Sequence, residues 1–240
     1  MLILSLFPGI GLLDMAFEEQ GFCVVRGPDA LWGGDIKRFH PPANRFDGII
    51  GGPPCQTFSQ LRYLVEHNGH SIKAENLIPD FERCIQEAQP AWFLMENVRQ
   101  APIPNIAGYG THSFLFDNRS CGGEQKRLRR ISFGVKGHDV NFLKHVELQT
   151  FECIDSAPTV CASGGVKKSL QSKRVGCRVM GWKTADALKD SLRLQGLPAD
   201  FLDHAPFTLK GKHTVVGNGV PLPMGRTLAN AVKQYLYDKT

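Results

Sequence analysis

The sequence predicts an α/β fold built on a largely parallel sheet that is flanked by helices. Short apolar runs bounded by glycine or proline occur four times in the first 100 residues, and helical patterns lie between several of them. Strands that alternate with helices are typical of parallel sheets, because each parallel connection has to cross back over the sheet. The four runs cover residues 2–7, 22–25, 46–50 and 91–95.

The elements follow one another in a recognisable order. The run at 2–7 is followed by Pro8-Gly9 and by apolar residues at helical spacing up to Gly21, which predicts a strand, a turn and a helix. The run at 46–50 ends in two glycines and two prolines, and a predicted helix over 75–89 precedes the run at 91–95. Beyond residue 100 the pattern is irregular, and the next predicted helices cover 185–194 and about 226–237.

Composition limits the class of protein. The chain has 240 residues, of which 42% are hydrophobic, enough for one globular domain. It has no run of about eighteen apolar residues and no basic leader, so we expect a cytoplasmic protein without a membrane segment. The seven cysteines form no C-x-x-C pair, which favours reduced thiols. We expect no metal site, since His67-x-x-His70 is not a recognised zinc spacing.

Charge is divided unevenly along the chain. Residues 1–120 carry 9 basic and 13 acidic side chains, a net charge of −4, whereas residues 121–240 carry 19 and 10, a net charge of +9. A polyanion favours a concentrated basic face, so the second half is where we expect nucleic-acid contacts, although a solvated basic surface has the same composition. The stretch 164–183 is typical of a surface loop, and its candidate nucleic-acid contacts are Lys167, Lys168, Lys173, Arg174 and Arg178.

Two loops that follow predicted strands are candidate ligand sites. The first, at residues 7–11, has glycines that let the backbone approach a ligand, although many strand-to-helix turns have no such role. The second places Cys55 after two prolines at a strand end, where open α/β sheets bind their ligands. A structural cysteine is more typical of the interior of a strand or helix, so this position favours a nucleophile.

A carboxylate and two arginines complete the candidate chemistry. Glu96 follows the apolar run at 91–95 and would share a sheet edge with Cys55 if the two strands are parallel. Arg127 and Arg129 are two residues apart, so in an extended strand they would project from one face and suit phosphates. A solvated glutamate and a salt-bridged edge strand are the competing interpretations.

Taken together, the motifs resemble those of the DNA cytosine-5 methyltransferase family. Pro54-Cys55-Gln56 resembles its nucleophile motif, Glu96-Asn97-Val98 its glutamate motif, Gln125-x-Arg127-x-Arg129 its arginine motif and Phe7-x-Gly9-x-Gly11 its S-adenosylmethionine loop. Gly34-Asp35-Ile36, Ala157-Pro158-Thr159-Val160 and Gly217-Asn218-Gly219-Val220-Pro221 are similar to further motifs, all in the family's order.

The resemblance implies a Rossmann-like S-adenosylmethionine-dependent methyltransferase fold in three segments. Residues 1–120 would form the cofactor-binding and catalytic core, and residues 121–215 the arginine motif with a small, irregular DNA-recognition lobe. Residues 216–240 would return to the cofactor pocket. The implied cofactor contacts are Phe7, Gly9, Ile10, Gly11, Asp29, Asp35, Ile36, Pro54, Asn218 and Val220. Asp29 fits an ordinary turn aspartate equally well.

The resemblance also implies methylation of cytosine C5 in DNA, with the target base flipped out of the helix. Cys55 would attack C6, and Glu96 would supply a proton or hydrogen bond at N3. Arg127 would hold the cytosine carbonyl and a phosphate, with Arg129 in support. Gln56 and Ser59 would lie near the gap left by the base. No residue is identified as the base that removes the C5 proton.

The chain departs from the family in two places. Only five residues separate Asp29 from Asp35, so a helix and part of the sheet are expected to be abbreviated. Only 24 residues, 134–157, stand where the family has its target-recognition domain, too few to bury a core. Specificity is then low, or the basic stretch 164–183 reads the bases, or a partner protein supplies recognition.

Two alternative functions stay open at this point. One is a tRNA cytosine-5 methyltransferase, for which a small recognition region is suitable because RNA can be recognised by shape. The other is a non-catalytic nucleic-acid-binding homologue that needs a partner. The short length fits a bacterial or phage-encoded protein, and the sequence does not predict an oligomeric state.

Overall fold

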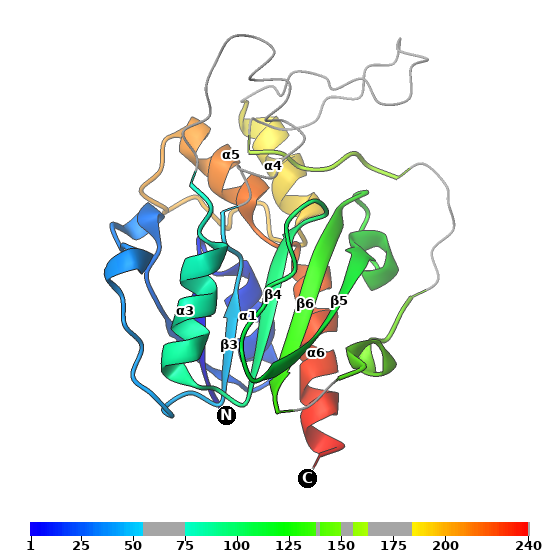
Figure 1. The fold of residues 1–240 in the computed structure, drawn as a ribbon. Coiled ribbons are helices and arrows are strands. Elements are labelled where there is room, and N and C mark those ends of the chain that lie inside the picture. The colour runs from blue at the N-terminus through cyan, green and yellow to red at the C-terminus, as the bar shows by residue number, and fades with distance from the viewer. Residues whose placement is uncertain (55–74, 138–139, 150–155, 163–183, 240) are drawn as a thin grey trace.

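The computed structural model describes residues 1–54, 75–137, 140–149, 156–162 and 184–239. Their strands form a six-stranded sheet of order β2-β1-β3-β4-β6-β5 (Figure 1). The strands are β1 (Leu2–Leu6), β2 (Cys23–Arg26), β3 (Gly48–Gly51), β4 (Trp92–Val98), β5 (Tyr109–Asp117) and β6 (Leu128–Lys136). The first four pair in parallel, and β6 runs antiparallel to β4 and β5. The predicted α/β fold with a largely parallel sheet is confirmed.

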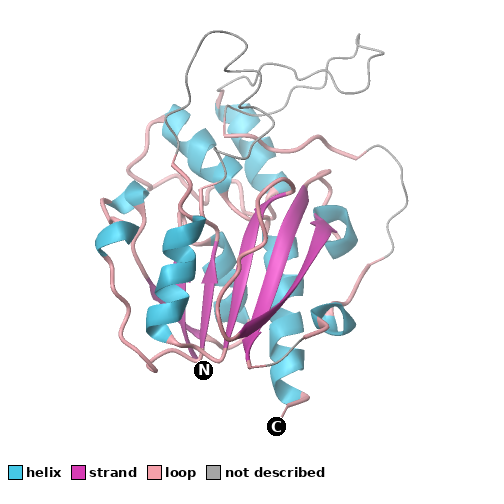
Figure 2. Ribbon diagram, viewed as in Figure 1, coloured by secondary structure: helices cyan, strands magenta, loops and turns pink. Residues whose placement is uncertain are grey.

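Helices cover both faces of the sheet (Figure 2). Helix α3 (Ile78–Ala88) packs on one face, and α1 (Leu12–Glu19) and α6 (Leu222–Tyr237) pack on the other. Helices α4 (Ala185–Leu194) and α5 (Leu209–Asn218) lie at the end of the sheet where the parallel strands terminate (Figure 1). Within the described part of the chain, every helix is too short or too polar to span a membrane.

Burial of both faces explains why the central strands are continuous apolar runs. Along β4, Trp92 and Leu94 belong to the core beneath α1 and α6, whereas Phe93 and Met95 belong to the core beneath α3. Side chains alternate between the faces of a strand, so a strand covered on both sides has few polar positions in its interior. This arrangement leaves the strand ends as the places where polar side chains can gather.

Several elements differ from the sequence predictions. Helix α4 has the predicted bounds, α3 begins three residues late, and α6 begins four residues early, at Leu222. Neither α5 nor β5 was predicted. Strand β6 lies in the segment expected to form a second lobe, yet it pairs with β4 and β5, so residues 128–136 belong to the main sheet. On the opposite side the described sheet ends at β2, and a single 3-10 turn, η1 (Ala30–Trp32), stands in the abbreviated connection.

Candidate functional site

The loops after β3 and β4 meet at one edge of the sheet. The two strands are parallel and in register, with Gly51 opposite Met95, so Glu96 follows at the edge where the chain continues from β3 towards Cys55. The last described residue before Cys55 is Pro54. The predicted site residues Cys55, Gln56, Ser59, Lys167, Lys168, Lys173, Arg174 and Arg178, together with His67 and His70, lie outside the described residues.

Glu96 lies between an arginine and the loop that precedes Cys55. The residue is 8% exposed, and its Oε1 is 2.9 Å from Nε of Arg129 on β6. A Cβ placed on Gly52 would be 3.5 Å from Oε2 of the same carboxylate. One oxygen therefore faces a cation, and the other lies beside the loop after β3. A buried carboxyl in this position can hold a substrate nitrogen while the cation keeps the carboxyl oriented.

Asn97 fixes the same loop to β4. Its side chain is 1% exposed, and Nδ2 donates a hydrogen bond of 3.1 Å to the carbonyl oxygen of Pro53. Its Oδ1 accepts from the amide of Val98 at 2.8 Å. Since the loop carries two prolines and is tied to a buried strand, the direction in which the chain leaves towards Cys55 is restricted. Asn97 belongs to the Glu96-Asn97-Val98 motif, and its role in holding this loop is not evident from the sequence.

The two arginines of the predicted pair do not act on the same partners. Strand β6 begins at Leu128, so Arg127 precedes the strand, and its side chain is buried, with 2% exposure. Its Nη1 donates to the carbonyl of Val160 at 2.8 Å, and its Nη2 donates to Gly217 and Gly219 at 3.1 and 3.0 Å. Of the two arginines, Arg129 is the one shown beside Glu96, and the expected contact of Arg127 with the substrate stays a prediction.

Two glutamines join Arg127 in a buried polar network. Gln125 donates to Oε1 of Gln195 at 2.8 Å and accepts from the amide of Val160 at 3.1 Å. Gln195 in turn donates to the carbonyl of Gly219 at 3.0 Å. Both glutamines are fully buried, and buried polar groups of this kind are normally hydrogen-bonded. Gln125, Arg127 and Gln195, called the buried hub below, connect the arginine motif with α4 and with the turn between α5 and α6.

The glycine loop after β1 has the backbone of a ligand site. Gly9 and Phe7 have φ angles of 57° and 58°, and the latter is strained because it carries a side chain. Oδ2 of Asp29 accepts from the amide of Gly9 at 2.8 Å, and Nε1 of Trp32 donates to its carbonyl at 2.8 Å. Oδ1 of Asp29 accepts from the amide of Leu31 at 2.7 Å. Asp29 thus has the turn role that the sequence allowed, and it ties the loops after β1 and β2 together.

A cavity of about 460 Å³ lies at this edge of the sheet. Its lining includes five of the predicted cofactor residues, namely Phe7, Asp29, Asp35, Ile36 and Pro54. The lining also contains residues that were not predicted as cofactor contacts, namely Pro28, Ala30, Gly33, Gly34, Lys37, Glu75 and Leu77. Predicted cofactor residues that do not line it are Gly9, Ile10, Gly11, Asn218 and Val220. The volume lies in the range of cavities that bind small molecules.

The chemistry of the lining fits a nucleoside. Phe7, Ile36 and Leu77 offer apolar surface to a flat ring, and the carboxylates of Asp29 and Asp35 can accept hydrogen bonds from hydroxyl or amino groups. Pro54 belongs to the lining and directly precedes Cys55, so the cavity reaches the loop that carries the candidate nucleophile. In the described residues, no three His, Cys, Asp or Glu side chains are grouped so as to hold a metal ion.

The turn between α5 and α6 packs beside the glycine loop, although it does not line the cavity. A Cβ on Gly219 would lie 2.6 Å from a methyl carbon of Leu12, the first residue of α1. Val220 is buried next to this contact, whereas Asn218 is exposed. Gln195 supports the turn and was missed by the sequence analysis. The glycine after it marks a helix end, but no sequence signal distinguishes a buried glutamine there from an exposed one.

Comparisons of sequence place the chain among known proteins. The profile of the C-5 cytosine-specific DNA methylase family matches residues 33–176. The chain is 34% identical over 167 residues to the type II methyltransferase M.NgoPII of Neisseria gonorrhoeae, covering 57% of this chain and 48% of that protein. It is 29% identical over 177 residues to the type II methyltransferase M.HgiDI of Herpetosiphon aurantiacus, covering 61% of this chain and 56% of that protein. The chain thus spans about half the length of these relatives.

Comparisons of structure support the same fold. A DNA modification methyltransferase encoded within an E. coli prophage matches with a TM-score of 0.63 and 17% identity, covering 99% of both chains. The Dnmt2 methyltransferase of S. pombe matches with a TM-score of 0.61 and 13% identity, covering 100% of this chain and 99% of that one. Similarity at such low identity establishes the fold.

Proposed function

The chain belongs to the C-5 cytosine-specific DNA methylase family, and from this premise we propose that it transfers a methyl group to C5 of cytosine in DNA. The observation that carries the proposal is the position of Glu96, which lies between Arg129 and the loop that leads to Cys55. A carboxyl, a guanidinium and a candidate thiol-bearing loop at one sheet edge, beside a nucleoside-sized cavity, suit this reaction better than simple binding.

The proposed mechanism begins with Cys55. C5 of cytosine is a poor nucleophile, so the thiolate first adds to C6, and the ring electrons move towards N3. Glu96 supplies a proton or hydrogen bond at N3, which stabilises the resulting enamine, and C5 then takes the methyl group. Loss of the C5 proton to a base restores the C5–C6 double bond and expels the thiolate. We assign no residue to that base, and we propose Cys55 from its sequence motif.

The two arginines have separate roles in this mechanism. Arg129 is 2.9 Å from the Glu96 carboxylate, so it orients Glu96 and can reach the carbonyl oxygen of a cytosine held there. Arg127 donates to the backbone carbonyls of Val160, Gly217 and Gly219, and through these contacts it holds segments that lie around the site. We therefore propose that Arg129 is the catalytic arginine and that Arg127 is a positioning residue.

We propose S-adenosylmethionine as the methyl donor. Its adenine would lie against Phe7, Ile36 and Leu77, with Asp29 and Asp35 accepting from its hydroxyl and amino groups. When bound, the donor supplies a methyl group made electrophilic by a sulfonium. Pro54 would direct that group towards the target base, because it lines the cavity and precedes the nucleophile.

The proposed substrate is a base flipped out of duplex DNA, since neither C5 nor C6 can be reached within the stack. We propose that Lys167, Lys168, Lys173, Arg174 and Arg178 contribute phosphate contacts, with Gln56 and Ser59 near the gap. A partner protein that reads sequence stays part of the proposal, because the chain spans about half of its relatives.

Nucleoside mass spectrometry tests the activity. The full chain is incubated with S-adenosylmethionine and either unmethylated genomic DNA or bulk tRNA, and Cys55→Ala is the control. We expect 5-methylcytosine in the DNA with the wild-type chain and none with Cys55→Ala. Methylation confined to tRNA would overturn the proposal in favour of an RNA substrate. No product in either would overturn the proposal that this chain is active alone.

A further inference from the structure

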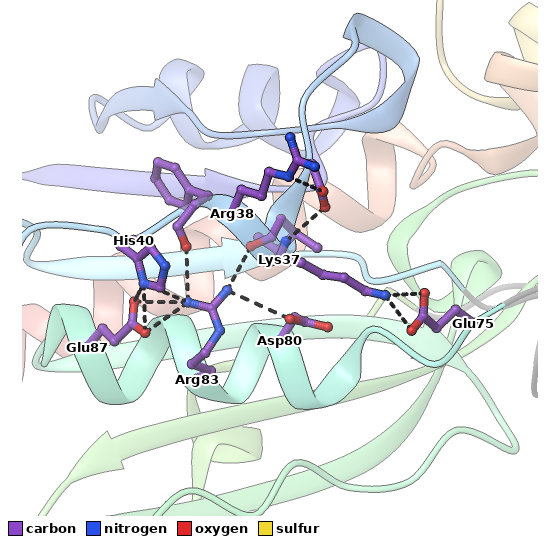
Figure 3. Close-up of polar contacts among 10 residues, drawn as sticks. Lys37, Arg38, His40, Glu75, Asp80, Arg83 and Glu87 are labelled. Atoms are coloured by element: carbon purple, nitrogen blue, oxygen red, sulfur yellow. Dashed lines mark hydrogen bonds and ion pairs between the residues drawn. The ribbon is translucent and has the colours of Figure 1, made fainter.

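Arg83 on α3 holds a backbone turn at the edge of the cavity. The turn is η2 (Ile36–Arg38), which follows Asp35 and places Asp35 and Ile36 in the cavity lining. Nη2 of Arg83 donates to the carbonyl of Ile36 at 2.7 Å, and Nη1 donates to the carbonyl of Phe39 at 3.0 Å (Figure 3). One planar guanidinium therefore contacts both ends of the turn, although more than 40 residues separate it from them in sequence.

Carboxylates keep the guanidinium in place. Both oxygens of Glu87, one helical turn later on α3, accept from Nη1 of Arg83 at 2.9 and 3.0 Å, and Oδ1 of Asp80 lies 3.7 Å from Nη2. Nδ1 of His40 lies 3.1 Å from Glu87, so the far end of the turn joins the same group (Figure 3). We call His40, Asp80, Arg83 and Glu87 the Arg83 cluster. Because these groups surround a rigid donor, the guanidinium has one preferred orientation.

Among the described residues the turn has few other polar contacts, although Ile36 is buried in the core beneath α3 and Oδ1 of Asp35 accepts from the amide of Lys37 at 3.0 Å. Its own backbone hydrogen bonds, from Arg38 to Asp35 and from Phe39 to Ile36, are both 3.2 Å long. The turn also forms an ion pair, between Lys37 and Glu75, and both of these side chains are exposed. Exposed pairs of that kind contribute little, about 0 to 1 kcal/mol. Pairs within a helix, such as Arg83 with Glu87, also contribute little to stability, so the contacts with the turn are the distinctive feature of Arg83.

We infer that Arg83 is a positioning residue for the methyl donor. It does not contact the donor but holds the turn that does. This inference rests on the proposed function, because it takes the cavity to be the donor site. By fixing the carbonyls of Ile36 and Phe39, Arg83 fixes where Asp35 and Ile36 meet the adenine. Arg83 therefore determines both the affinity for the donor and the ability to reject an adenine that carries an extra group on its amino nitrogen.

The test measures binding of S-adenosylhomocysteine and of its N6-methyladenine form to the full chain by calorimetry. For Arg83→Met we expect the Kd of the unmodified ligand to rise about tenfold, as for the loss of one charge-assisted hydrogen bond. We also expect the N6-methyl form to be rejected less strongly than by the wild type. Arg83→Lys keeps the charge but cannot donate to both carbonyls in one plane, so its Kd should rise about fivefold.

Arg226→Met is the matched control. Arg226 makes a two-contact ion pair with Glu19, at 2.6 and 2.8 Å, and neither residue lines the cavity. This variant should leave the Kd and the selectivity unchanged, whereas a general loss of stability would alter all variants alike. If both Arg83 variants have the Kd and the selectivity of the wild type, the inference about Arg83 is overturned, whereas the proposed function is not affected. Failure of the wild type to bind either ligand would overturn the proposed function and this inference with it.

Discussion

The buried hub and the Arg83 cluster hold backbone in the same way but in different surroundings. In both, an arginine donates to carbonyls of a segment that is distant in sequence and lies close to the glycine loop or the cavity. Arg127 is almost completely buried, whereas the Arg83 side chain is 29% exposed. The contact between a guanidinium and backbone carbonyls is therefore made in the interior by Arg127 and near the surface by Arg83.

This difference determines what each arginine controls. A buried carbonyl that loses its donor has no water to replace it, at a cost of roughly 1 to 3 kcal/mol for each group. A carbonyl near the surface can bind water instead, so losing its donor costs little stability but allows the turn to move. We expect the buried hub to govern whether the chain folds as one unit, and the Arg83 cluster to govern the shape of the donor site.

The largest effect is expected for Arg127→Met. The buried carbonyls of Val160 and Gly217 would lose a charged donor, and the partly buried carbonyl of Gly219 would keep only Gln195, so the free energy of unfolding should fall by about 3 to 5 kcal/mol. Urea unfolding measures it. Arg129→Met is the matched variant: it leaves the mostly buried Glu96 without its cation, so we expect a smaller loss of about 1 to 3 kcal/mol while methylation is abolished. Equal stability losses in the two variants would contradict the division of roles.

A smaller loss of stability is expected for Gln195→Met, which keeps the volume and removes the amide. The buried carbonyl of Val216 loses its donor from Gln195, Gly219 keeps only Arg127, and Gln125 loses one acceptor, so we expect about 2 kcal/mol less stability. Gln234→Met on the exposed side of α6 should change stability by less than about 0.5 kcal/mol. If both glutamine variants unfold at the same urea concentration as the wild type, Gln195 does not belong to a stabilising network.

Asn97→Ala should lower both the stability of the fold and the rate of methyl transfer. The buried amide contacts one carbonyl, that of Pro53, so stability should fall by about 1 to 2 kcal/mol. The loop before Cys55 would also be released, and the rate of methyl transfer should fall about 100-fold, as misplaced reacting groups do. Donor affinity should stay the same. A kcat equal to that of the wild type would show that the loop is held by other contacts.

A smaller effect is expected from the salt concentration, which should change donor binding through the Arg83 cluster. The Arg83 cluster is accessible to water, so raising the salt concentration from about 0.05 to 0.5 M should weaken donor binding about twofold in the wild type. Arg83→Met should show no such dependence, because its turn is already released. Calorimetry at the two salt concentrations measures this, and equal salt dependence in both chains would exclude the cluster as the cause.

The smallest effect expected is a pH dependence through Glu87. Burial alone would raise its pKa, but the hydrogen bonds with Arg83 and His40 bring the pKa below its ordinary value. Because the folded-state pKa is the lower one, the stabilisation is present above the ordinary pKa of about 4.3 and is lost as the pH falls below it. When the pH is lowered from 7 to about 3, below the ordinary pKa of the carboxyl, the melting temperature of Glu87→Gln should fall slightly less than that of the wild type.

The sequence predicted the central parallel strands β1, β3 and β4 well because they are buried on both faces. The apolar runs around Ile3, Ile49 and Phe93 have no other plausible location. Strand β5 was missed because Thr111, His112 and Ser113 interrupt its apolar pattern, and α5 was missed because it contains two glycines. These elements owe their structure to neighbours that a local pattern does not contain.

The candidate site was predicted only in part, for a physical reason that the two arginines illustrate. A spacing of two residues puts side chains on one face only if both residues belong to a strand, and β6 begins after Arg127. The cavity lining brought together Phe7, Asp35 and Ile36 as the motifs implied. Arg83 acts through backbone carbonyls, which have no sequence signature, so only the structure could identify it.

Covalent trapping tests the central claim most directly. A DNA duplex with 5-fluorocytosine at a methylation site is incubated with the chain and S-adenosylmethionine, and the bound peptide is mapped by mass spectrometry. Fluorine at C5 cannot leave as a proton does, so the adduct with the attacking residue persists. We predict a denaturation-resistant complex through Cys55 that is absent in Cys55→Ala. An adduct that survives this substitution, or that maps to another residue, would contradict the account.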